Sequence, residues 1–164
     1  MKIQFEIIRS QGAEHLCYRA DGMYVDVSNP MVAFTDEDEF EIVKQDESLL
    51  RKEYEYNGSK VRLVPEFYGN GWPALTLKMA EDGELYTVLS VNLEEMDAIG
   101  LPDRTFIDTS NNPEAMEFLV SKGLATDTGY KRRSGWVEYP MAVLNLPLLF
   151  LHDPQAFQHT NINL

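Results

Sequence analysis

The three histidines and the single cysteine are the side chains most suited to metal binding or nucleophilic chemistry, but their spacing supports neither. His15, His152 and His159 lie near the two ends of the chain, without an HxH or HExxH spacing. His152 is followed by Asp153, and no third ligand is nearby in the sequence. Cys17 has no second cysteine for a disulfide or a metal site, which predicts an inert, packed thiol. We therefore expect no metal and no other cofactor.

Carboxylates are the remaining candidates for acid–base chemistry. Some of them could meet in a cleft: Glu66, Asp82, Glu84, Asp103 and Asp108. In a chain with 27 acidic residues, however, most such pairs form by chance on the solvated surface. The chain also has no GxSxG elbow, no GxxxxGK[ST] loop and no GxGxxG loop. A non-enzymatic protein is the better prediction, and we assign no catalytic residue.

The most conspicuous motif, FIDTSNNPEAMEFLVSKGLATDTG (106–129), has a structural explanation. Residues 106–108 predict a short strand, and a helix is predicted over about 113–122. Asn112 would be the N-cap, and Pro113 suits the first helical position, where its missing N–H is harmless. Gly123 and Leu124 predict a Schellman ending.

Net charge is the strongest deviation in composition: 27 acidic and 14 basic residues give −13, and the acidity is spread over the chain. Such a surface is unsuited to direct nucleic-acid binding, which needs Lys and Arg to neutralise phosphates. It suits a partner with a basic surface, although solubility alone is a sufficient reason for the charge. The densest acidic segment supplies the candidate binding residues Asp36, Glu37, Asp38, Glu39 and Glu41. It lacks the glycine of a calcium-binding loop.

Two further clusters are candidates for binding. Aromatic residues gather around YEYNG and FYGNGW, where Tyr68 and Trp72 are the candidate binding residues, although cross-strand aromatic pairs commonly only stabilise a sheet. Lys131, Arg132 and Arg133 form the only dense basic group and are predicted to lie in an exposed hairpin turn.

Alternating apolar residues and turn signals predict an α+β fold: an antiparallel β-sheet of hairpins with one principal helix packed on it, and a β-rich N-terminal lobe. The predicted strands are 2–9, 23–28, 31–36, 60–68, 74–79, 85–93, 106–108 and 135–146, with Asn57-Gly58 as a tight turn. Two organisations are open: a lobe at 1–50 followed by an α+β domain at 51–164, or one continuous domain over 1–164.

Residues 52–146 resemble an uncharacterised family, the domain of unknown function 4313. The resemblance is carried by YNG, ALTLKMAEDGELYTVLSVNL, the motif at 106–129, and SGWVEYP. It does not cover the N-terminal fifty residues, and family members often end soon after the YP strand. The resemblance implies an accessory gene of a conjugative or other mobile element, and no established activity.

These observations together predict a non-enzymatic, acidic, protein-binding module of a mobile element, acting in the cytoplasm on a protein with a basic surface. An antirestriction or anti-CRISPR type of nucleic-acid mimic fits the charge. One alternative is a small-ligand-binding protein or enzyme with a cleft near the aromatic hairpins and Asp108. Another is a structural component of a transfer apparatus. In that case the apolar segment NLPLLFL (145–151) would be exposed, and the protein would oligomerise through it. No membrane association is expected, because no apolar run is long enough to span a bilayer and the N-terminus lacks a signal-peptide core.

Overall fold

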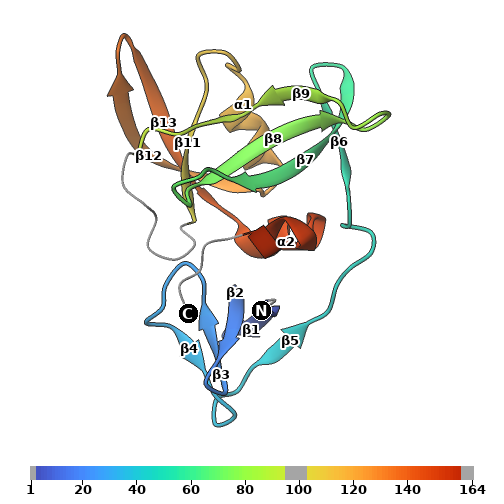
Figure 1. Ribbon diagram of the computed structural model, residues 1–164, viewed down its shortest axis with the longest axis vertical. Helices are drawn as coiled ribbons and strands as arrows, with labels where there is room; N and C mark the ends of the chain where they lie inside the picture. Colours follow the sequence, from blue (N-terminus) through green and yellow to red (C-terminus); the bar gives the residue numbers. More distant parts are fainter. Residues whose placement is uncertain (1–2, 95–102, 160–164) are drawn as a thin grey trace.

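The computed structural model describes residues 3–94 and 103–159, and within them the chain is built mainly of antiparallel strands (Figure 1). The strands are β1 (Phe5–Ser10), β2 (Ala13–Ala20), β3 (Met23–Asp26), β4 (Ala33–Phe34), β5 (Glu41–Val43), β6 (Glu53–Tyr56), β7 (Ser59–Phe67), β8 (Pro73–Met79), β9 (Leu85–Val88), β10 (Ser90–Val91), β11 (Arg104–Ile107), β12 (Ala125–Ser134) and β13 (Val137–Leu144). The helices are α1 (Ala115–Ser121), α2 (Leu146–His152) and the 3-10 helix η1 (Pro154–His159). The prediction of an α+β chain dominated by antiparallel hairpins is confirmed at this level.

The N-terminal sheet has five strands in the order β4-β3-β2-β1-β5. The predicted β3–β4 hairpin is present, with Tyr24 opposite Phe34. β2 was not predicted, because its sequence AEHLCYRA buries only Leu16 and Cys17 and shows no period-2 pattern. It is nevertheless the central strand of this sheet, since it pairs with both β1 and β3.

The rest of the chain forms two four-stranded sheets, ordered β6-β7-β8-β9 and β10-β11-β13-β12, where a single sheet was predicted. The predicted strand 85–93 divides at the fully buried Leu89: β9 pairs with β8, and β10 pairs with β11. The Leu89 amide donates to the Leu75 carbonyl, and its own carbonyl accepts from the Asp108 amide. Leu89 therefore joins the two sheets. Leu85, at the start of the outer strand β9, is 61% exposed.

Two predictions that depend on backbone conformation alone are confirmed: the tight turn at Asn57-Gly58 and the helix ending at Gly123. Asn57 and Gly58 both have positive φ values, 50° and 80°, as the tight β6–β7 turn requires. At the end of α1, Gly123 has φ of 71°, its amide donates to the Val120 carbonyl, and the Leu124 amide donates to the Leu119 carbonyl. These two bonds make the predicted Schellman ending.

The start of α1 was predicted wrongly. The helix begins at Ala115, and its N-cap is Glu114, whose side chain makes no capping bond. Asn112 is buried and bonds to the neighbouring sheet: its amide nitrogen donates to the Val88 carbonyl at 3.1 Å, and its amide oxygen accepts from the Thr87 hydroxyl at 3.0 Å. A tertiary hydrogen-bonding role therefore replaces the local capping role.

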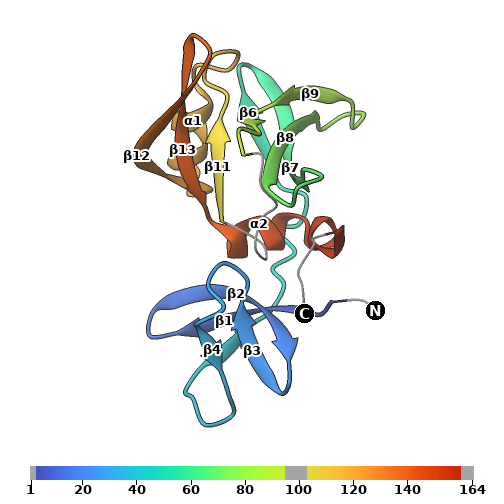
Figure 2. The same cartoon turned by 60° about the vertical axis from the view of Figure 1, so that its left-hand side comes forward.

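The predicted last strand, 135–146, ends at Leu144, and the chain then forms α2. The Asn145 side chain caps this helix by accepting from the Leu148 amide at 3.2 Å, with Pro147 in the first turn. α2 lies between the N-terminal sheet and the two other sheets (Figures 1 and 2). Its buried leucines, Leu146, Leu149 and Leu151, belong to one hydrophobic cluster with Leu16 of the N-terminal sheet and Leu63 of β7. The core is thus continuous from the N-terminal sheet to the rest of the chain.

Among residues 3–94 and 103–159, no helix is long and apolar enough to cross a membrane.

Candidate functional site

The acidic segment forms the connection between β4 and β5, at the end of the N-terminal sheet farthest from the other sheets (Figure 1). All five candidate carboxylates are exposed: Asp36, Glu37, Asp38, Glu39 and Glu41. Asp38 folds the segment into a turn, because its carboxylate accepts from the Thr35 amide at 2.7 Å. Glu41 forms an ion pair with Arg9. The ion pairs of the described residues include none of the other four carboxylates, so these four present uncompensated negative charge to solvent.

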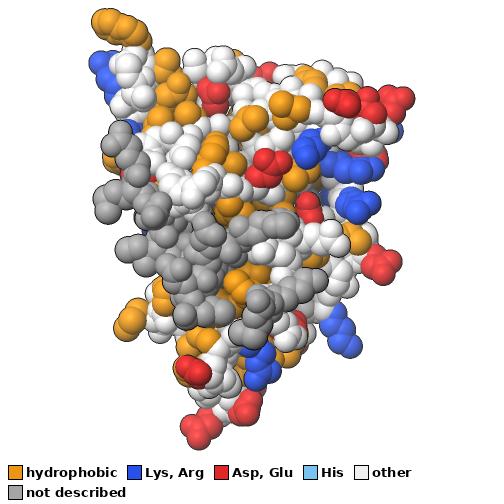
Figure 3. Space-filling model, in the orientation of Figure 1, with side chains coloured by type: hydrophobic (Ala, Val, Ile, Leu, Met, Phe, Trp, Pro, Cys, Tyr) orange, Lys and Arg blue, Asp and Glu red, His pale blue; other side chains and the backbone are white. Residues whose placement is uncertain are grey.

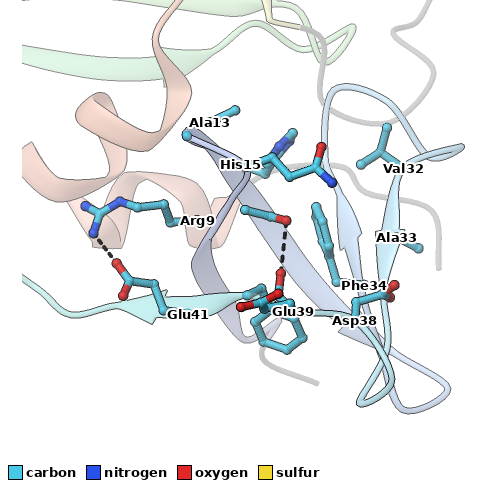
Figure 4. Close-up of a pocket in the computed structure, with 13 residues that line it drawn as sticks. Arg9, Ala13, His15, Val32, Ala33, Phe34, Asp38, Glu39 and Glu41 are labelled. Carbon is cyan, nitrogen blue, oxygen red and sulfur yellow. Dashed lines mark hydrogen bonds and ion pairs between the residues drawn. The ribbon is translucent and has the colours of Figure 1, made fainter.

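A space-filling view shows acidic side chains at this lower end of the molecule (Figure 3). Beside the acidic turn lies an open groove of about 920 Å³ (Figure 4). One wall comes from Arg9 and Glu41, and the other comes from Val32, Ala33 and Phe34. Asp38, Glu39 and Phe40 also line it. The groove therefore combines aromatic surface with carboxylates, a surface that suits a cationic or amphipathic group.

His15 lines the same groove, and its ring is hydrogen-bonded to the buried carboxylate of Asp26. Its Nδ1 lies 2.7 Å from Oδ2 of Asp26, a residue only 6% exposed. The other Asp26 oxygen accepts from the Ser28 amide, the Ser28 hydroxyl and the Asn29 amide. These bonds satisfy the buried carboxylate and order the turn after β3, so a structural role accounts for the pair. Sequence reasoning did not identify it, because the two residues are eleven positions apart and meet only through pairing of β2 with β3.

The second depression, of about 260 Å³, lies where the N-terminal sheet meets the end of β13 and the start of α2. Asp26 and Asp103 both line it. Burial raises the pKa of Asp103, and the ion pair with Arg104 opposes this shift. The described residues contain no group of three or more His, Cys, Asp or Glu side chains arranged to hold a metal.

The candidate residues Tyr68 and Trp72 lie at the β7–β8 turn, far from the acidic segment (Figure 1). The Tyr68 hydroxyl is 2.9 Å from Ser90 Oγ, which in turn accepts from the Leu75 amide. Burial raises the pKa of Tyr68. The Tyr68 amide donates to the Trp72 carbonyl, which closes the turn. The structure therefore does not bring these two residues together with the acidic candidates, and Tyr68 joins the β7–β8 turn to β10.

The basic residues lie in a strand rather than in the predicted turn. Lys131, Arg132 and Arg133 are part of β12, and the turn itself falls at Gly135 and Trp136. Arg132 pairs with Glu94 at 2.6 Å. Lys131 and Arg133 are exposed and appear in none of the ion pairs of the described chain.

His152 and Cys17 are packed in the interior. The Tyr54 hydroxyl lies 2.5 Å from His152 Nε2 and the two rings are stacked, while burial lowers the pKa of His152. Burial, with a contribution from Asp26, raises the pKa of Cys17 to about 12, so the predicted inert thiol agrees with its environment.

The C-terminal three-fifths of the chain is similar to a known protein family. Residues 65–163 match the family described as Domain of unknown function (DUF4313). The chain belongs to this family. The match begins later than the predicted resemblance at residue 52 and continues beyond the YP strand through the region of α2 and η1. No curated protein and no solved structure shows significant similarity to the chain.

The matched region begins within β7 and holds β8 to β13 and the helices α1, α2 and η1 of the described chain, but it excludes the acidic turn and β1 to β6. The N-terminal sheet, which carries the acidic turn and the groove, therefore lies outside the part of the chain that the family match covers.

Proposed function

We propose that this chain is an acidic protein-binding module that presents the β4–β5 turn to a basic surface of a partner protein. The observation that carries the proposal is the set of four exposed carboxylates, Asp36 to Glu39, which have no cationic partner among the described residues. The β4–β5 connection that carries them lies at one end of the molecule (Figure 1), where a large partner can reach it.

Electrostatics gives this arrangement a physical role. A chain with net charge −13 attracts basic proteins over distances of about one Debye length, about 10 Å at 0.1 M salt. Unpaired carboxylates at the contact then favour Lys and Arg over neutral side chains. A partner that itself binds nucleic acid offers such a surface, so the proposed mode of action is charge mimicry of the antirestriction or anti-CRISPR type. The proposed setting is the cytoplasm, as an accessory protein of a conjugative or other mobile element; it rests on the family resemblance described above.

The test begins with a pull-down from the lysate of the organism that encodes the chain, at about 0.05 M and about 0.5 M salt, which span strong and weak screening. The affinity of the captured protein is then compared for the wild type and an acidic-turn variant, Asp36→Lys, Glu37→Lys and Glu39→Lys. These three side chains make no hydrogen bond or ion pair with other described residues, whereas Asp38 is retained because it holds the turn through Thr35.

A matched control places the same three reversals elsewhere, at Glu47, Glu81 and Glu84, which are also exposed. Both variants change the net charge by six units, from −13 to −7. We expect the acidic-turn variant to lose binding with an unchanged melting temperature, and the control to retain most of it. Equal binding by the two variants would show that overall charge, and not this turn, is responsible.

A further inference from the structure

The β12–β13 hairpin ends in a tryptophan that this chain leaves uncovered. Trp136 is 96% exposed, and Tyr130 of β12 is 55% exposed. A fully exposed indole gains nothing for the fold, while tryptophan is among the residues that contribute most to binding at protein interfaces. The exposed indole makes the hairpin tip a candidate contact surface for another molecule.

The charge next to the tip narrows the choice of partner. Lys131 and Arg133 are exposed and unpaired among the described residues, whereas Arg132 is neutralised by Glu94. Glu138 lies opposite Arg133 in the strand pair but forms no ion pair with it within the described chain. An aromatic tip flanked by two free cations fits a surface that combines aromatic side chains with carboxylates.

The groove beside the acidic turn has this composition. Phe34, Phe40 and His15 line it, with the ring centroids of His15 and Phe34 5.2 Å apart, and Asp38 and Glu39 supply negative charge. Its volume of about 920 Å³ is sufficient for an indole ring together with an adjoining basic side chain. The groove lies beside the β4–β5 connection. This connection and the tip of the β12–β13 hairpin lie towards opposite ends of the long axis of the molecule (Figures 1 and 2), so the tip cannot reach the groove of its own copy.

We propose that the chain self-associates head to tail, with the β12–β13 hairpin of one copy docked in the groove of the next copy. Trp136 contacts Phe34 and Phe40, and Lys131 and Arg133 pair with the carboxylates of the acidic turn. Because two different surfaces meet, each added copy leaves one hairpin and one groove free, and growth continues unless the rotation closes a ring. This inference goes beyond the proposed function, and it needs only the purified chain.

The experiment is sedimentation of the purified chain from about 10 μM to about 1 mM, a range that covers weak protein contacts, at low and high salt. We expect the average mass to rise with concentration and to rise less in high salt. Trp136→Ala should weaken association at least about tenfold, as loss of a central interface tryptophan does. Leu85→Ala, which truncates another exposed apolar side chain, is the control and should associate as the wild type does.

Charge exchange gives the sharpest test. A hairpin variant, Lys131→Glu with Arg133→Glu, and the acidic-turn variant described above should each be monomeric, because each then carries like charges on both surfaces. A mixture of the two should associate again, since the acidic turn of the first meets the basic hairpin of the second. Circular dichroism and melting temperature show that each variant is folded.

The inference is overturned if the wild type is monomeric at the highest concentration, if Trp136→Ala associates as strongly as the wild type, or if the mixture of the two charge variants does not associate. If the acidic-turn variant associates fully while Trp136→Ala does not, hairpins pack against each other and the head-to-tail arrangement is wrong. Failure of partner capture would leave these results unaffected, so this inference and the proposed function can fail separately.

Discussion

Substitution of Asn112 by aspartate distinguishes two possible roles of this side chain: capping the helix that follows it, or hydrogen-bonding its loop to β9. As an N-cap, asparagine can be replaced by aspartate with little change in stability, because both side chains accept a backbone N–H. In the structure the Asn112 amide instead donates to the Val88 carbonyl and accepts from the Thr87 hydroxyl, in a site 8% exposed. Aspartate keeps the acceptor and loses the donor, and it places a carboxylate against a carbonyl.

The expected magnitudes follow from these two bonds. Asn112→Ala removes both, at about 1 kcal/mol each, so the free energy of unfolding should fall by about 2 kcal/mol. Asn112→Asp should cost about 3 kcal/mol at neutral pH, because a poorly solvated charge is added to the lost donor. Protonation restores a donor, so the folded-state pKa of this aspartate lies above its unfolded value. The penalty should therefore be largest above the folded-state pKa and shrink as the pH falls towards the unfolded value.

Urea unfolding monitored by circular dichroism measures these differences, with equal slopes required for a valid comparison. Asn111→Ala is the control, because Asn111 is exposed and its side chain bonds, within the described residues, to Asp108 alone; we expect a change below about 1 kcal/mol. The reasoning is refuted if Asn112→Asp is as stable as the wild type at neutral pH, since only a helix cap tolerates that change.

Three further predictions concern the buried histidine, the end of α1 and the thiol. Burial lowers the folded-state pKa of His152, so the free energy of unfolding should fall as the pH drops from about 6.5, the unfolded value, towards the folded-state pKa. In urea unfolding measured across this pH range, His152→Gln should remove part of the decrease. A pH profile identical to that of the wild type would contradict this prediction. Gly123→Ala should lower the free energy of unfolding by about 1 kcal/mol, because the backbone φ of Gly123 is 71°. Gly69 lies outside the left-handed region, so Gly69→Ala should change the free energy of unfolding little. Equal losses of stability in the two variants would argue against the backbone explanation. Cys17, with its pKa raised to about 12 and its side chain buried, should resist iodoacetamide at pH near 8 until urea unfolds the chain, and rapid native labelling detected by mass spectrometry would show otherwise.

Features that depend on a few neighbouring residues were predictable from the sequence. Asn57-Gly58 and Gly123 adopt the positive φ that their turns require, since backbone sterics act locally. The short β3–β4 hairpin was predictable for the same reason. The candidate binding residues of the acidic segment are all exposed, because uncompensated charge is costly to bury.

Features that depend on partners distant in the sequence were predicted less well. No helix was predicted at α2, and its first residue was placed in the predicted strand 135–146, although Asn145 and Pro147 are a helix-start signal that could have identified it. Its leucines are buried in the core, which removes the exposed apolar segment on which a structural transfer role would rest. The pairing of His15 with Asp26, and the groove beside it, had no signal in the sequence, because both arise from strand register.

By itself, the sequence determined the antiparallel α+β class, the turn chemistry, the helix ending at Gly123 and the acidic character of one segment. These follow from backbone sterics, hydrophobic periodicity and charge, all of which act over a few residues. Tertiary structure alone decided that Leu89 joins two sheets and that Asn112 ties a loop to β9. It also decided that the β12–β13 hairpin and the β4–β5 connection lie towards opposite ends of the molecule (Figure 1). Each of these features depends on which segments, distant in the sequence, pack against each other. The hydrophobic effect drives this packing but has no preferred direction, so no single sequence motif encodes the arrangement.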